Sequence, residues 1–140
     1  MKAIGKCTYQ SPLSQTKTSL IIAKEHFWMT QMQMSLLFGC RVQQVHTTLK
    51  KLFASGELDP KLVNQRLEIP HASGRMIRGN FYNLDAVIAA GYRLNPKEAT
   101  HLHIWSMQML KAHLLEETSH VRTSIIGSLR QKITHMLAVA

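Results

Sequence analysis

Between positions 41 and 51 the chain carries polar side chains that can bind a nucleic acid, and no acidic one. Glutamine can form two hydrogen bonds to an adenine edge, threonine can reach a base edge or methyl group, and lysine suits phosphate or guanine. The residues concerned are Arg41, Gln43, Gln44, Thr47, Lys50 and Lys51. They are the candidate DNA-binding residues of this segment.

Helical spacing would bring most of these side chains to one surface. At 100° per residue, a helix starting at Val42 places five of the six opposite an apolar stripe. That stripe is formed by Val42, Val45, Leu49, Leu52 and Phe53. The alternative is an ordinary solvated helix face, but such faces usually interleave Glu with Lys. The missing acid favours DNA.

A second group of basic residues falls in a predicted β-hairpin. Residues 66–69 and 76–82 have strand-like patterns and are separated by a loop containing Pro70 and Gly74. Arg75 and Arg78, with His71 nearby, would give this hairpin a positive charge that suits the phosphate backbone. The same arginines could instead solvate an edge strand and discourage its pairing. The two roles are compatible.

No residue pattern points to catalysis, a cofactor or a metal. There is no serine in a nucleophile elbow and no glycine loop for phosphate, and the acidic residues are too scattered to form a pair. His101 and His103 are two positions apart and project differently, so they cannot share a metal as an i,i+4 pair would. We expect no enzyme, no catalytic residue, no cofactor and no metal site.

The sulfur-containing residues also have a simpler interpretation as core or isolated side chains. Met29, Met32 and Met34 lack Cys or His at ligand spacing, which favours core packing. Cys7 and Cys40 share no motif and cannot form a disulfide framework.

Charge and composition agree with a nucleic-acid partner. The 140 residues are 45% hydrophobic, so the chain can bury a core, and 17 Lys and Arg face 8 Asp and Glu, for a net charge of +9. The charge is uneven, because residues 1–80 hold 11 Lys and Arg against 4 Asp and Glu. Nucleic acid is the commonest partner of such a chain, followed by a membrane surface or an acidic protein.

Residues 30–53 have the spacing of a helix-turn-helix. Gln31 opens one helix after the predicted N-cap Thr30, Ser35 supplies a small residue where two helices nearly touch, and Gly39 suits the corner. Val45 is the apolar anchor of the second helix. With the hairpin that follows, this pattern predicts a winged helix-turn-helix.

The flanking segments complete an α+β architecture. Residues 4–9 and 19–23 read as N-terminal strands. Asn83 caps a short helix through Ala90 that Gly91 ends. Asn95, Pro96 and Glu98 mark the start of a longer helix that ends near Glu116.

These elements suggest three parts: a winged helix-turn-helix domain over 1–84, a helical extension packed on it over 85–117, and an amphipathic C-terminal helix or tail over 118–140. The helix of residues 96–116 is apolar around much of its circumference, which implies burial against the domain or a second copy. The C-terminal helix is expected to pack on the domain or dimerise. A membrane-surface helix is the alternative, but the run lacks aromatic residues and a lipidation signal.

Three blocks of sequence resemble the RhuM family of bacterial proteins, which is linked to virulence, pathogenicity islands, prophages and restriction loci. They cover roughly residues 20–117. The first is Trp28-Met29-Thr30-Gln31 with Met34 and Leu37-Phe38-Gly39. The second is Phe53, Ser55-Gly56-Glu57-Leu58 and Tyr82-Asn83-Leu84-Asp85. The third is Gly91-Tyr92-Arg93-Leu94-Asn95, with Thr100, Ile104-Trp105, Gln108, Leu110-Lys111 and Leu114.

The resemblance implies a DNA-binding module from a mobile genetic element. The chain departs from the family at Arg41, where Ser is usual, and near Gln43, where Pro is usual. It also departs at Leu102 and His103, where the family tends to have an aromatic residue and then Arg. Longer members continue into a second domain that this chain lacks, and the last twenty-odd residues do not match the family.

We therefore expect a sequence-specific binder of double-stranded DNA, a transcriptional regulator that is a homodimer through the helix of residues 96–116 and the C-terminal helix. The alternative is a protein-interaction module, antitoxin-like or an accessory subunit in a phage or restriction locus. No signal peptide or membrane span is evident, so a cytoplasmic location without membrane contact is expected.

Overall fold

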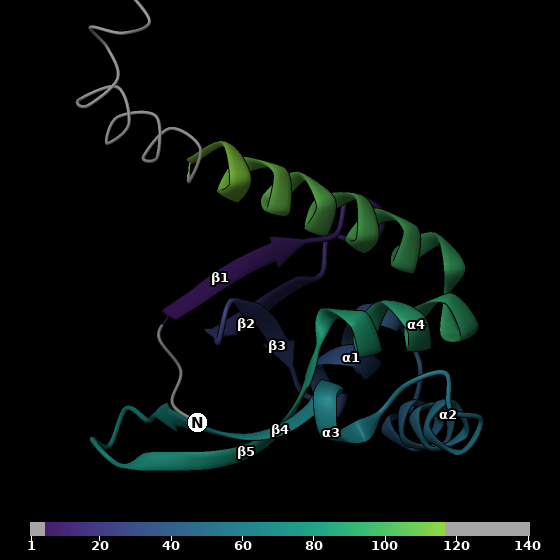
Figure 1. Cartoon of the computed structure of the whole chain (residues 1–140), viewed down its shortest axis with the longest axis horizontal. Helices are drawn as coiled ribbons and strands as arrows, with labels where there is room; N and C mark the ends of the chain where they lie inside the picture. The colour runs from purple at the N-terminus through teal and green to yellow at the C-terminus, as the bar shows by residue number, and fades with distance from the viewer. Residues whose placement is uncertain (1–4, 117–140) are drawn as a thin grey trace, which may run out of the picture. The chain divides into compact units, whose positions relative to one another are not determined.

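The computed structural model describes residues 5–116 and has a mixed α+β architecture, as the sequence predicted (Figure 1). The elements in chain order are β1 (Gly5–Gln10), β2 (Lys17–Ala23), β3 (His26–Met29), α1 (Gln31–Phe38), α2 (Val42–Ala54), α3 (Pro60–Val63), β4 (Asn64–Pro70), β5 (Met76–Asn83) and α4 (Leu84–Leu94). Residues 96–116 are also helical. The predicted C-terminal helix of residues 118–140 lies outside the described residues.

The strands form one five-stranded antiparallel sheet in the order β1-β2-β3-β5-β4. Both N-terminal strands and both hairpin strands were predicted, whereas β3 was not. β3 occupies the centre of the sheet and joins β2 to β5. It therefore connects the N-terminal strands to the β4–β5 hairpin.

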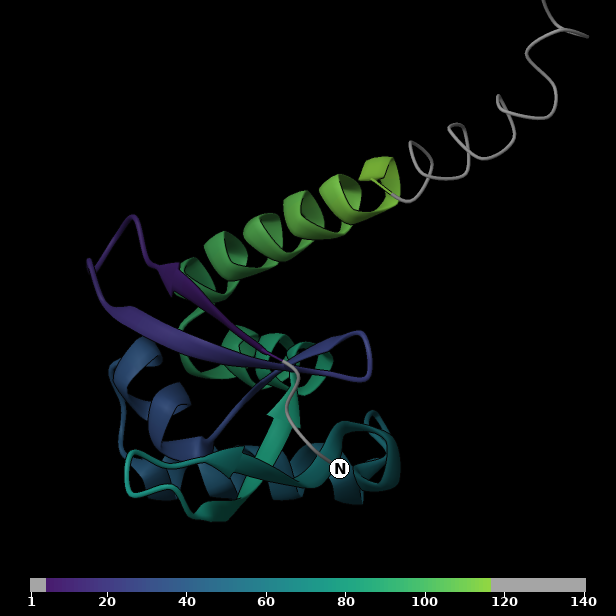
Figure 2. The ribbon, with the colours of Figure 1, turned by 90° about the vertical axis from the view of Figure 1, so that its left-hand side faces the viewer.

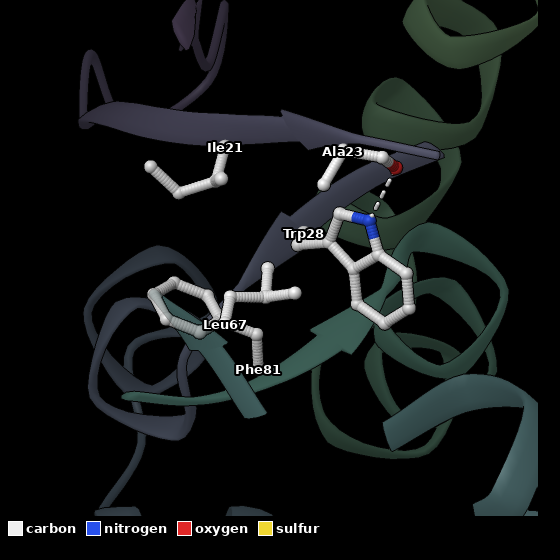
Figure 3. Close-up of a cluster of buried hydrophobic side chains, with 5 residues drawn as sticks. All are labelled: Ile21, Ala23, Trp28, Leu67 and Phe81. Atoms are coloured by element: carbon white, nitrogen blue, oxygen red, sulfur yellow. Dashed lines mark hydrogen bonds between the residues drawn. The ribbon is translucent and has the colours of Figure 1, made fainter. Parts of the chain in front are cut away.

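A buried cluster holds the two halves of the sheet together (Figure 3). Four strands contribute to it, and its members are Ile21, Ala23, Trp28, Leu67 and Phe81. The indole nitrogen of Trp28 donates a hydrogen bond of 2.8 Å to the carbonyl oxygen of Ala23. The only polar atom of this large side chain is thus satisfied inside an apolar cluster.

α1 begins and ends as the sequence predicted. The hydroxyl of Thr30 accepts from the backbone N–H of Gln33, and the Gln33 side chain accepts from the N–H of Thr30, which completes a capping box. Gly39 ends the helix with φ of 67°, a left-handed conformation that costs glycine little. Met34 is buried as expected, but Met32 is 58% exposed and is not a core residue.

α4 packs against α1 and α2, and it runs three residues beyond the predicted end at Gly91. Gly91 is a buried interior residue of this helix. A Cβ atom there would lie 2.5 Å from a ring carbon of Phe38 and 3.0 Å from the Cβ of Ala99. This glycine therefore permits close helix packing instead of ending the helix.

The described residues fall into two units, 5–104 and 105–116. In the first unit, the Ser11 hydroxyl lies 2.6 Å and 2.9 Å from the two carboxylate oxygens of buried Glu98. This contact fixes the β1–β2 turn to the start of the helix of residues 96–116. In the second unit, residues 105–116 expose large apolar side chains at Met107, Leu110, Leu114 and Leu115.

Candidate nucleic-acid interface

The start of α2 is set by a side chain that the sequence assigned to DNA. The side-chain oxygen of Gln44 accepts a hydrogen bond of 2.9 Å from the backbone N–H of Arg41. Since an arginine side chain has no acceptor, Arg41 cannot complete the reciprocal half of a capping box. Gln44 thus stabilises the first turn of α2, and only its amide nitrogen is left to contact a ligand.

The rest of α2 separates cleanly into a buried and an exposed side. Val45, Leu49 and Leu52 are buried, whereas Val42 and Phe53 are only half-buried, so the predicted apolar stripe is narrower than expected. The exposed side contains every α2 residue proposed for DNA, namely Gln43, Gln44, Thr47, Lys50 and Lys51, and Arg41 just before the helix is exposed as well. No acidic residue occurs in α2, and the positive charges of this surface lie at its two ends, at Arg41 and at Lys50 and Lys51.

One edge of α2 lies against the hairpin. The rings of Phe53 and Tyr82 are stacked, with centroids 6.4 Å apart and planes inclined by 17°. In two perpendicular views, α2 and the hairpin of β4 and β5 lie along the same side of the first unit (Figure 1 and Figure 2). The C-terminal end of α2 is therefore next to the base of the hairpin.

A polar contact supports the same junction. The amide nitrogen of Gln31, in the first turn of α1, is 3.0 Å from the Tyr82 phenol oxygen and 3.4 Å from Nδ1 of His46. The side-chain nitrogen of Asn80 also reaches the Tyr82 oxygen, at 3.5 Å. Because an amide nitrogen only donates, the phenol and Nδ1 act as acceptors. One glutamine thus connects α1, α2 and β5.

The two predicted hairpin arginines lie in different surroundings. Arg75 is exposed in the loop between β4 and β5, where its carbonyl oxygen accepts from the N–H of His71. Arg78 is in β5 and forms an ion pair of 3.2 Å with Glu68 on β4. The carboxylate of Glu68 neutralises the positive charge of Arg78, which was predicted from the sequence to contact the phosphate backbone.

Sequence patterns alone missed four residues of this surface: Gln31, His46, Arg66 and Asn80. Arg66 and Asn80 are directly opposed across β4 and β5, and both are exposed. Side chains two apart on a strand share a face, so Asn80 shares the face of Tyr82, and Arg66 shares it as the cross-strand neighbour of Asn80. The alternation of side chains along residues 76–83 could have shown that Asn80 and Tyr82 share a face of the hairpin. The sequence could not show that this face is turned toward α2.

Metal-binding and membrane-spanning features are absent from the part of the chain that the structure describes. Within residues 5–116, no group of three or more His, Cys, Asp or Glu side chains is placed to hold a metal ion. In the same residues, no helix combines the length and apolar character needed to cross a membrane. Cys7 and Cys40 are free thiols, and burial raises the pKa of the Cys40 thiol above its ordinary value.

Comparison of the chain with family models, with curated proteins and with solved structures gave no match.

Proposed function

We propose that the protein binds double-stranded DNA sequence-specifically through a winged helix-turn-helix, with α2 as the recognition helix and β4–β5 as the wing. The observation that carries the proposal is the acid-free, exposed side of α2 beside the hairpin base. A solvated surface helix has no need to exclude acids over its whole length. A helix that approaches phosphates does, because each carboxylate would be repelled.

The dimensions of α2 suit a major groove. Its 13 residues give a length of about 20 Å, and the groove is about 12 Å wide, which admits a helix. Gln43 and Thr47 are at the centre of the exposed side and can read base edges. Lys50, Lys51 and Arg41 can contact phosphates, while Gln44 contributes mainly by capping the helix.

The resemblance to the RhuM family implies a DNA-binding module from a mobile genetic element. We propose a transcriptional regulator that binds as a homodimer. The supporting observation is the apolar surface of residues 105–116, where Met107, Leu110 and Leu114 are exposed. A two-fold dimer would bind two half-sites, and its operator would be an inverted repeat.

A gel-shift salt titration tests the proposal, with Gln43→Ala, Lys51→Ala and Lys97→Ala as matched variants. Lys51→Ala should weaken binding to all duplexes and lower the salt slope by about 0.9. Gln43→Ala should reduce discrimination between sequences while keeping the salt slope. Lys97→Ala removes an equal charge from another exposed site and should behave as the unaltered protein. If the unaltered protein binds no duplex at low salt, the proposal is wrong.

The alternative function is a protein-interaction module, favoured by the same exposed apolar residues at 105–116. Light scattering on the full chain and on the double variant Leu110→Glu/Leu114→Glu separates the cases. A dimer that becomes a monomer supports self-association. A full chain that is already a monomer, with no duplex bound, favours a different protein as the partner.

A further inference from the structure

We infer that the hairpin contacts DNA phosphate through Arg66 at its base, and not through the arginines toward its tip. This inference rests on the proposed DNA-binding function and names the hairpin residue that serves it. Arg66 begins the first strand of the hairpin predicted from the sequence, but it was not among the residues assigned to DNA there.

The three hairpin arginines lie at different distances along the strands from the contact with α2. Tyr82, which contacts α2 through Phe53, is opposite Asn64 in the register, and Arg66 is two residues further along β4. At about 3.4 Å per residue, Arg66 is about 7 Å along the strand from that junction. Arg78 is about 14 Å from it and Arg75 about 24 Å by the same rise. Of the three hairpin arginines, Arg66 is therefore nearest along the strands to the contact between Tyr82 and α2.

The hairpin arginines also differ in whether an acidic side chain neutralises them. Arg78 is paired with Glu68, so the two together attract phosphate weakly. Arg66 is exposed, and within residues 5–116 no ion pair involves it. Asn80, directly opposite Arg66, adds an amide that can donate to a phosphate oxygen. Asn80 already orients its nitrogen toward Tyr82, so it is held at this end of the hairpin.

These features let α2 and the hairpin bind the same duplex. With α2 in the major groove, the hairpin face that contains Asn80 and Arg66 would lie next to the backbone of the flanking DNA. A guanidinium can hold a phosphate with two parallel hydrogen bonds, which sets the position of the helix in the groove. Arg66 thus contributes to affinity at every sequence and carries no base preference.

The test is the salt dependence of binding by Arg66→Ala, Arg66→Lys, Arg75→Ala and Lys97→Ala, each checked for folding by circular dichroism. Arg66→Ala should lower the salt slope by about 0.9 and weaken binding about eightfold at 0.1 M salt. Arg66→Lys should have the salt slope of the unaltered protein, because it keeps the positive charge. Arg75→Ala and Lys97→Ala should also have the unaltered slope.

Two results would overturn the inference while leaving the proposed function intact. One is a slope for Arg66→Ala equal to that of Lys97→Ala in a protein that binds duplex DNA. The other is a salt slope that decreases by about 0.9 in Arg75→Ala, which would place the phosphate contact at the hairpin tip. If the unaltered protein binds no DNA, the proposed function is wrong and the inference falls with it.

Discussion

The side-chain amide of Gln31 donates a hydrogen bond of 3.0 Å to the phenol oxygen of Tyr82, and it thereby joins α1 to the hairpin. The two residues are 51 positions apart in the chain. The contact is part-buried and lies beside the stacked rings of Phe53 and Tyr82. It fixes the hairpin base relative to α2, the arrangement on which the proposed DNA surface depends.

A double-mutant cycle with Gln31→Ala and Tyr82→Phe should measure this contact. We expect a coupling energy of about 1 kcal/mol in urea unfolding, because each single variant removes the same hydrogen bond. Tyr82→Phe keeps the ring that stacks on Phe53, so this variant removes the hydroxyl without changing the ring packing. Additive effects of the two changes would show that the hydrogen bond contributes nothing to stability.

The turn between β2 and β3 contains backbone strain that glycine would relieve. Lys24 and Glu25 have φ of 46° and 63°, a left-handed conformation that is unfavourable for residues with a Cβ. Glu25→Gly should therefore raise the free energy of unfolding by about 1 kcal/mol. Glu25→Ala is the control, since it removes the charge and keeps the Cβ. Equal stability of the two variants would contradict a backbone origin.

The close approach of α4 to α1 predicts a strong effect of Gly91→Ala. The added Cβ would lie 2.5 Å from the Phe38 ring, which must move. Overpacking of this kind costs about 1–3 kcal/mol in unfolding free energy. In a Phe38→Leu background the same substitution should cost much less. If the cost is unchanged in that background, the ring contact is not its cause.

Alkaline stability should depend on Tyr9. Burial, and then the nearby charge of Glu98, raise the pKa of the Tyr9 phenol above its ordinary value of 10.0, while a hydrogen bond from Ser11 acts in the opposite direction. A folded-state pKa above the unfolded one gives stability that is complete below pH 10 and is lost as pH rises through the folded pKa. Tyr9→Phe should flatten the fall in melting temperature above pH 10. An identical fall in both proteins would exclude Tyr9 as its cause.

The regular parts of the fold could be predicted from the sequence because they have local causes. α1 and α2 are determined by caps and one-sided burial. Thr30 and Gly39 cap α1, and Val45, Leu49 and Leu52 give the buried side of α2. The strands of the hairpin alternate and flank a Gly-containing loop. Each of these signals operates within a few residues, so a single sequence contains it.

Features that depend on distant contacts could not be predicted in the same way. β3 is short, and its turn uses Lys24 and Glu25 where a sequence pattern expects Asn-Gly. Gly91 looks like a helix end, and only the Phe38 ring shows why a glycine is needed inside α4. In the candidate site, exposure of the α2 residues followed from spacing, whereas pairing of Arg78 with Glu68 depended on strand register.

Selection of duplexes from a random pool by the full-length protein is the most direct test of the central claim. We predict that a common sequence motif is enriched and that it binds about a thousandfold more tightly than the unselected pool at the same salt concentration. Enrichment should be lost with Gln43→Ala/Thr47→Ala, which removes two central side chains of α2 and leaves every positive charge. A protein that retains no duplex at low salt, or that enriches no motif, would contradict the claim that α2 reads DNA sequence.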